Sequence, residues 1–236
     1  MIFNRIPRNY KTIDTSIKLL LHCNGEDASN EFIDSSASAH TITANGNAQI
    51  DTSVKKFGTG SGAFNGSSAY LTISDSDDFN FGSGDFTIDL WLYLNTSGSY
   101  RIMAQQSTSD DDYMINWYIA SDNILRLLYS TNGSLWDNAS DTKGSIALTV
   151  LTMNHIALVR NGSGIQQYVN GILDKTWTIG TASLHNSATE LWIGAGQYVG
   201  GSSFLNGNID EFRISKGIAR YTGDFTPATS EFSIYK

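Results

Sequence analysis

The sequence of 236 residues contains a single cysteine, two prolines and few charged side chains. The lone Cys23 excludes a disulfide within the chain and a zinc site built from several cysteines. Charged residues make up only 16% of the chain. This argues against a helical bundle, because helix surfaces normally carry many charged side chains. The sequence also lacks an apolar run of the roughly 20 residues that a membrane-spanning helix needs, so we expect no membrane partner.

Basic residues are also scarce. The chain has 15 Lys and Arg against 23 Asp and Glu, which gives a formal net charge of −8. A nucleic-acid-binding protein needs a basic surface patch to neutralise phosphates, so nucleic acid is not expected as a partner. The exception is the stretch from residue 1 to 20, whose net charge is +3, while the remainder carries −11.

This basic N-terminus is predicted to form an extended arm over residues 1–16, followed by one domain over residues 17–236. The arm lacks the apolar core of a secretory signal, so folding in a cytosol is expected. An isolated terminus of this kind is most often a solvated tail. The alternative is a peptide that anchors the domain to an assembly partner through its apolar and basic side chains, which are Ile2, Phe3, Arg5, Ile6, Arg8 and Tyr10.

Short β-strands are the dominant local pattern. Asn-Gly, the preferred pair for a tight hairpin turn, recurs at residues 24, 45, 65, 132, 161, 170 and 206. Between these turns the sequence alternates with period two; in residues 86–94, Thr87, Asp89, Trp91 and Tyr93 lie opposite the apolar face. The pattern predicts an all-β, antiparallel two-sheet sandwich. The predicted strands are residues 17–22, 61–64, 70–74, 86–94, 113–120, 124–130, 155–160, 166–169, 172–178, 191–195 and 209–215.

Six segments taken together resemble the laminin-G-like, concanavalin A-like jelly-roll family, in the branch found in phage and environmental bacterial proteins. They are LLLHCNGED (19–27), residues 32–73, DDFNFGSGDFTIDLWLYL (77–94), NHIALVRNGSGIQQYVNG (154–171), ELWIGAG (190–196) and FLNGNIDEFRISKGIARYTGDFTP (204–227). The resemblance implies a jelly roll for the fold. It does not specify a function, because this fold hosts lectins, adhesion domains and hydrolases.

A hydrolase of this fold needs two carboxyl groups that flank the bond to be cleaved. Related glucanases place them on one strand as Glu-x-Asp-x-(x)-Glu. None of the glutamates of this chain share a strand at that spacing. The nearest match surrounds Asp89, which we interpret as a polar residue on an outward face. The sequence therefore predicts no enzyme, with a divergent glycoside hydrolase as an alternative.

The resemblance also implies a structural calcium ion where the first strand ends beside the last long strand. Carried over residue by residue, its ligands are Asn24, Asp27 and Asp210. Asn24 stands where the family usually has Asp, which removes one negative charge from the site. The expected role of the ion is to clamp the terminal strands.

Aromatic side chains with polar neighbours are the expected signal of carbohydrate binding, because sugar C–H surfaces pack on aromatic faces. Trp136 and Tyr100 fall in predicted loops, and Trp91 and Tyr93 alternate with Asp89 opposite the apolar face. The alternative for Trp136, which the sequence leaves open, is that it folds back over the sandwich edge. The remaining strand tryptophans, Trp117 and Trp192, are predicted to lie in the core.

These observations favour a non-catalytic structural or adhesion module on a phage virion, such as a capsid decoration, fibre or tail protein. It would be made in the host cytoplasm, anchored by its arm to other virion proteins, and would contact host-surface glycans. The alternative is an extracellular carbohydrate-binding module of a secreted bacterial protein. Association into homo-oligomers through sheet edges is a further expectation.

Overall fold

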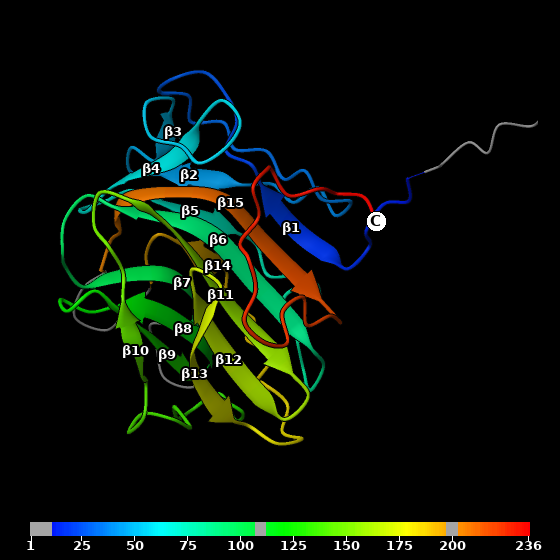
Figure 1. The fold of residues 1–236 in the computed structure, drawn as a ribbon. Coiled ribbons are helices and arrows are strands. Elements are labelled where there is room, and N and C mark those ends of the chain that lie inside the picture. Colours follow the sequence, from blue (N-terminus) through cyan, green and yellow to red (C-terminus); the bar gives the residue numbers. More distant parts are fainter. Residues whose placement is uncertain (1–10, 107–111, 197–202) are drawn as a thin grey trace, which may run out of the picture.

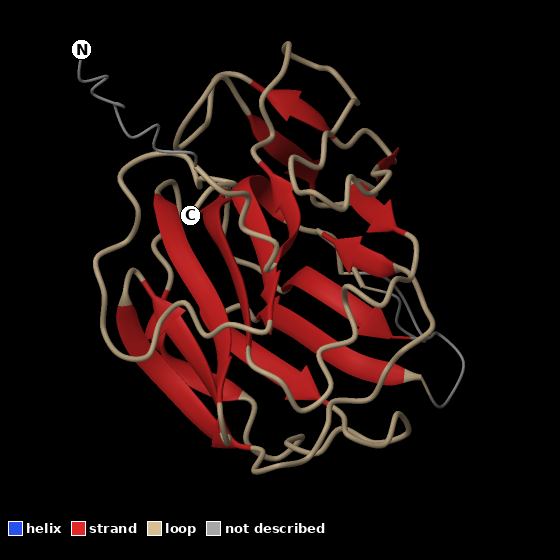
Figure 2. Ribbon diagram, turned by 90° about the vertical axis from the view of Figure 1, so that its right-hand side faces the viewer, coloured by secondary structure: helices blue, strands red, loops and turns tan. Residues whose placement is uncertain are grey.

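The chain folds into two antiparallel sheets packed face to face (Figures 1 and 2). The computed structural model describes residues 11–106, 112–196 and 203–236. The eight-stranded sheet has the order β13 (Ile172–Thr178), β12 (Gly164–Val169), β11 (Met153–Asn161), β6 (Phe86–Leu94), β15 (Asn206–Lys216), β4 (Ser61–Asn65) and β3 (Gln49–Asp51), with β1 (Ile17–Leu21) also paired to β15. The seven-stranded sheet has the order β10 (Lys143–Ala147), β9 (Ile124–Tyr129), β8 (Tyr113–Ile119), β7 (Tyr100–Gln106), β14 (Leu191–Ile193), β5 (Tyr70–Ile73) and β2 (Thr43–Asn45).

The predicted sandwich is confirmed, and period-two alternation explains it. In β6, the five apolar residues at alternate positions are fully buried in the core between the sheets: Phe86, Ile88, Leu90, Leu92 and Leu94. The intervening side chains point away from that core. Within the described part of the chain, no helix has the length and apolar character to span a bilayer.

The C-terminal segment, residues 217–236, covers the outer face of the eight-stranded sheet. Figure 1 shows it in red, running across β15 and its neighbours. Phe232 packs with Ile17 and Leu20 on that face. Tyr221 and Phe225 contact a second buried group on β11 and β12. The eight-stranded sheet is therefore buried on both faces over much of its area.

The start and the end of the described chain pair with each other. Ile13 forms an antiparallel bridge with Tyr235, and the Asp14 amide donates to the Ile234 carbonyl at 2.8 Å. Part of the predicted arm therefore contacts the domain just before β1 begins. The predicted anchoring residues lie outside the described residues: Ile2, Phe3, Arg5, Ile6, Arg8 and Tyr10.

Candidate functional site

The outer face of the seven-stranded sheet carries a stacked aromatic pair. Trp192 on β14 lies opposite Thr72 on β5, which makes Tyr70 its diagonal neighbour on the same face. The two rings are 4.3 Å apart and nearly parallel, at 10°. Both side chains are half-buried. Phe204 adds a third ring, 6.0 Å from that of Tyr70.

Polar groups border this pair. Asn45 on β2 lies opposite Tyr70, and its Nδ2 donates to the Thr72 hydroxyl at 3.3 Å. The indole Nε1 of Trp192 is buried and has no acceptor among the described residues. We refer to Tyr70, Trp192, Phe204, Asn45 and Thr72 as the aromatic platform. It combines ring surfaces, an amide and a hydroxyl.

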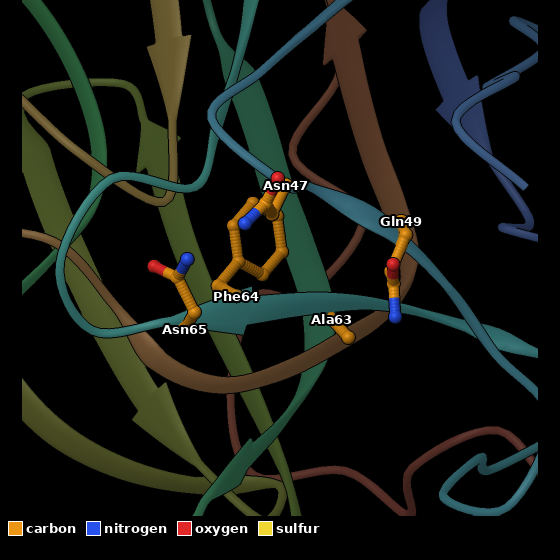
Figure 3. Close-up of a pocket in the computed structure, with 5 residues that line it drawn as sticks. All are labelled: Asn47, Gln49, Ala63, Phe64 and Asn65. Atoms are coloured by element: carbon orange, nitrogen blue, oxygen red, sulfur yellow. The ribbon is translucent and has the colours of Figure 1, made fainter. Parts of the chain in front are cut away.

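Three hollows that share lining residues lie along the edge strands β2 and β3. The first, of about 270 Å³, lies between β4 and the β2–β3 turn, and Figure 3 shows the five side chains that line it: Asn47, Gln49, Ala63, Phe64 and Asn65. The second, of about 400 Å³, shares Asn47 and Gln49 with the first. The third, of about 510 Å³, shares Ser29, Asn30 and Ala44 with the second.

The hollows are lined by neutral polar and apolar residues in similar numbers. Their amide side chains are Asn30, Asn47, Gln49 and Asn65, and their hydroxyl side chains are Ser29 and Thr43. Of the described residues that line them, Glu31 alone is charged. An amide both donates and accepts hydrogen bonds, so this lining suits a ligand rich in hydroxyl groups.

Comparison with protein families identifies the fold independently. Residues 65–219 match the family model described as the concanavalin A-like lectin/glucanases superfamily. The chain belongs to this superfamily. A search of curated proteins finds no match.

Solved structures that share this superfamily fold include toxin binding domains. The binding domain of Paraclostridial mosquitocidal protein 1 has a TM-score of 0.61 at 15% identity, over 86% of this chain and 49% of that one. The receptor-binding domain of botulinum neurotoxin D has a TM-score of 0.62 at 13% identity, over 88% and 51%. The chain thus spans about half the length of these structures, and the likeness concerns the fold.

Asp89 lies in the segment that comes nearest to the glucanase motif, and it was also predicted to bind a glycan. Asp89 lies on the outward face, as interpreted, but its prediction as a glycan-binding residue is wrong, because the side chain is fully buried under the C-terminal segment. Arg213 donates to its two oxygens at 2.9 and 2.7 Å, and the Tyr221 hydroxyl donates at 2.8 Å. Burial would raise the pKa of Asp89, but the Arg213 guanidinium outweighs it and holds the pKa below its usual range.

The other predicted binding residues are spread over different surroundings. Trp91 is only 5% exposed, with the Lys56 ammonium 4.0 Å from its ring centroid, and Tyr93 on the same strand is half-buried. The prediction of a loop at Tyr100 is wrong. Tyr100 begins β7 and its ring packs in the core.

Trp136 lies in a loop, as predicted. It is half-buried and folds back onto Tyr113, with ring centroids 4.8 Å apart and an angle of 16°. The neighbouring Leu135 is 68% exposed. The loop thus combines the two alternatives that the sequence left open, since Trp136 covers another ring and keeps part of its surface in solvent.

Trp192 is one of the platform residues that the sequence analysis missed. Its assignment to the core is wrong, whereas that of Trp117, which is fully buried, is confirmed. Leu191 and Ile193 both point into the core, so the side chain between them points outward. The apolar residues on either side of Trp192 were the sequence signal that this side chain points away from the core.

The residues predicted to hold calcium form hydrogen bonds to neighbouring loops. Asn24 Oδ1 accepts from the Thr59 amide at 2.5 Å, and Asp27 Oδ1 accepts from Thr52. Asp210 Oδ2 accepts from two loop amides, whereas its Oδ1 is buried without a partner among the described residues. Calcium takes six to eight oxygen ligands, and these three side chains leave only two oxygens without a hydrogen bond among the described residues, Asp27 Oδ2 and Asp210 Oδ1. They do not fit a calcium cage in this arrangement.

The surroundings of Asp210 and of His22 shift the pKa values of both side chains. Burial raises the pKa of Asp210 to about 6, although two backbone amides donate to it. Burial lowers the pKa of His22, but the hydrogen bond and the charge of Glu211 outweigh this effect, so that the pKa is raised above its usual value. His22 Nδ1 lies 2.7 Å from Glu211 Oε1.

Proposed function

We propose that this chain is a non-catalytic module that binds neutral glycans through the aromatic platform, with the hollows along β2 and β3 as a further polar surface. The observation that carries the proposal is the half-buried Tyr70–Trp192 pair, set beside Asn45 and Thr72 on an outer sheet face. Aromatic side chains offer a large apolar surface with a defined geometry. The amides and the hydroxyl supply the directional contacts that sugar hydroxyls need.

The charge of this region favours an uncharged ligand. The platform contains no ionisable group other than the Tyr70 phenol, and Glu31 is the one charged group among the described lining of the hollows. The chain as a whole carries a formal charge of −8. Anionic glycans would meet net repulsion from such a surface, whereas neutral hexose chains would not.

The surroundings of Asp89 and Glu211 support a role without catalysis. A retaining glycosidase needs two carboxyl groups about 5–5.5 Å apart on either side of the substrate. Asp89 is buried with both oxygens bound to Arg213. Glu211 is fully buried, and its two oxygens bond to His22 and to the Phe232 amide. Neither carboxylate is free to attack or protonate a substrate.

A glycan array followed by isothermal titration tests the proposal. We expect a neutral oligosaccharide to bind, and Trp192→Ala to weaken it tenfold or more, which corresponds to about 1.4 kcal/mol. Trp136→Ala is the matched control, because it removes a half-buried, stacked tryptophan elsewhere. Loss of binding in Trp136→Ala with full binding in Trp192→Ala would move the site to the 131–137 loop. No binding to any neutral glycan would refute the proposal.

We further propose that the module is displayed on a phage virion surface and anchored by its N-terminal arm. The resemblance to phage proteins and the contrast between a basic arm and an acidic domain support this role. Two solved structures of the same fold support a surface-binding function: one is named as the receptor-binding domain of botulinum neurotoxin D, and the other is named for the dependence of botulinum neurotoxin type C cell entry on interaction with two ganglioside molecules. An extracellular module of a secreted bacterial protein is the alternative.

Deleting residues 1–10 tests the anchoring role. This deletion keeps Ile13 and Asp14, which pair with the C-terminal segment, so the domain should melt at the same temperature as the full chain. We expect the truncated chain to be lost from particles produced by infection with the corresponding phage. Normal incorporation would refute anchoring by the arm.

A further inference from the structure

A β-bulge in β15 places two consecutive acidic residues on the same side of the sheet. Asp210 lies opposite Trp91 on β6, and Arg213 lies opposite Asp89, so two residues of β15 face the single Leu90 between them. Phe212 points into the core like Leu90, which leaves Glu211 as the inserted residue. Glu211 has a φ of 53°, a strained value for a residue with a side chain.

The inserted Glu211 meets groups from two other parts of the chain. His22 follows β1, and its Nδ1 lies 2.7 Å from Glu211 Oε1. Glu231 belongs to the C-terminal segment, where Asn24 Nδ2 donates to its Oε1 at 2.8 Å. One ligand atom from each of His22, Glu211 and Glu231 lies within 4.8 Å of the other two.

The burial of Glu211 and of the adjacent Asp210 distinguishes this cluster from a group of surface acids. Asp210 and Glu211 are both fully buried, and Asp210 Oδ1 has no partner in the described part of the chain. An unpartnered buried carboxylate oxygen is costly to maintain. The cluster therefore concentrates negative charge that its own hydrogen bonds do not fully compensate.

We infer that His22, Glu211 and Glu231 bind one divalent transition-metal ion of the zinc type, next in sequence to the buried carboxylate of Asp210. An imidazole nitrogen together with carboxylates suits zinc, whereas calcium prefers oxygen ligands alone. The ion would replace the proton shared by His22 Nδ1 and Glu211 Oε1, and that proton would pass to solvent.

Little movement is needed to form this site. Tetrahedral ligands at about 2.0–2.1 Å from zinc lie roughly 3.3 Å from one another. Glu231 is exposed at the surface end of the cluster, so its side chain can close the remaining gap. Glu211 Oε2 accepts from the Phe232 amide at 2.7 Å, a contact that would orient the ligand from behind.

The consequence concerns the C-terminal segment. Glu231 directly precedes Phe232, whose ring packs on Ile17 and Leu20. Metal bound to both Glu231 and Glu211 would fasten this segment across β15 and β1. The site is independent of the aromatic platform, so this inference does not rest on glycan binding.

Titration of metal-free protein tests the inference. After treatment with EDTA and dialysis, we expect one Zn2+ to bind per chain. At 100 times its dissociation constant, Zn2+ should raise the melting temperature by about 5 °C or more. Limited proteolysis within residues 217–236 should slow in parallel. Ca2+ at the same concentration should produce neither effect.

Two variants assign the ligands. Glu231→Gln removes an exposed carboxylate without disturbing the core, and should weaken Zn2+ binding tenfold or more. Glu190→Gln is the matched control, because it makes the same change at another exposed position, and should bind as the unaltered chain does. His22→Asn should also lose the effect while keeping a group that can donate to Glu211.

Three results would overturn the inference. The first is the absence of Zn2+ binding to the folded chain, and the second is unchanged affinity in Glu231→Gln. The third is a stabilisation by Ca2+ that is lost in Asp27→Asn but not in Glu231→Gln, which would instead support the calcium clamp at Asn24, Asp27 and Asp210.

Discussion

The outer faces of the two sheets each carry an Asp–Arg pair, and the pairs differ mainly in burial. On the eight-stranded sheet, Arg213 donates to Asp89 at 2.9 and 2.7 Å, and that carboxylate is fully buried. On the seven-stranded sheet, Arg126 of β9 donates at 2.8 and 2.9 Å to Asp122, which lies in the turn between β8 and β9 and whose side chain is 37% exposed.

The covering chain accounts for this difference. The C-terminal segment lies over β6, β11 and β15 and turns polar and aromatic side chains of that face into a second core. The aromatic platform on the other sheet remains half-buried. The same residue types therefore stabilise the fold on one face and remain accessible to a ligand on the other.

Removing Arg213 is the strongest way to test this comparison. Arg213→Ala leaves the Asp89 carboxylate buried without its cation, and we expect a loss of about 3–5 kcal/mol in the free energy of unfolding. Urea denaturation measures it. The double variant Asp89→Leu/Arg213→Leu should lose less than the single one, because it removes both charges. A loss below 1 kcal/mol in Arg213→Ala would show that water reaches this face.

Truncating Phe232 tests the cover itself. Its ring is 6% exposed and lies 3.7 Å from the Arg213 guanidinium carbon. We expect Phe232→Ala to cost about 3 kcal/mol, as for other buried aromatic truncations, and to speed hydrogen exchange in β15.

Tyr235→Ala is the control for this variant, since Tyr235 belongs to the same segment but is 44% exposed. It should change stability by less than about 0.5 kcal/mol. Equal losses in the two variants would indicate that the segment binds the sheet through its backbone rather than through Phe232.

The sequence predicted the strands better than the covering of their faces. β6 and β13 begin and end where alternation placed them. β2 and β3 are three residues long, too short for a period to be recognised, and β7 and β10 were missed as well. Alternation assigned Asp89 to the outer face, but its contact Tyr221 lies 132 residues further along. Local pattern carries no information about such a contact.

For the candidate sites, too, the sequence predicted local features but not contacts between distant segments. Trp136 was recognised as a loop residue because Asn, Ser and Asp surround it. The cluster of His22, Glu211 and Glu231 depends on a bulge and on a segment that arrives from the end of the chain. Neither feature has a sequence signature, so proximity of these three residues required the structure.

Asp14 lies before β1 and contacts Arg220 and Ile234 of the C-terminal segment. Its ionisation makes the stability of the fold depend on pH, with a sign that follows from its pKa. Burial would raise the pKa of Asp14, but hydrogen bonds from Ser16 and Arg220 outweigh it and lower the pKa below its usual value. The folded state therefore binds this proton more weakly than the unfolded state. The stabilisation is complete above about pH 5 and is lost as the pH falls through the folded pKa.

We expect Asp14→Asn to lower the free energy of unfolding by about 1–2 kcal/mol at pH 7, the range for hydrogen bonds to a charged group. The difference from the unaltered chain should shrink as the pH falls below about 4. Urea denaturation at a series of pH values measures it. A difference that stays constant from pH 7 to pH 2 would contradict the ion pair between Asp14 and Arg220.

We expect the smallest loss of stability from Arg126→Ala on the seven-stranded sheet, although the corresponding change on the eight-stranded sheet, Arg213→Ala, should cause the largest. Arg126→Ala breaks an ion pair of nearly the same geometry as Asp89–Arg213, but exposed pairs contribute about 0.2–1 kcal/mol. Lys143 also lies 3.0 Å from Asp122, so the carboxylate keeps a cation. Salt at 1 M shortens the screening length to about 3 Å and should abolish the difference in urea denaturation. A loss comparable to that in Arg213→Ala, or one that salt does not change, would mean that this face is covered as well.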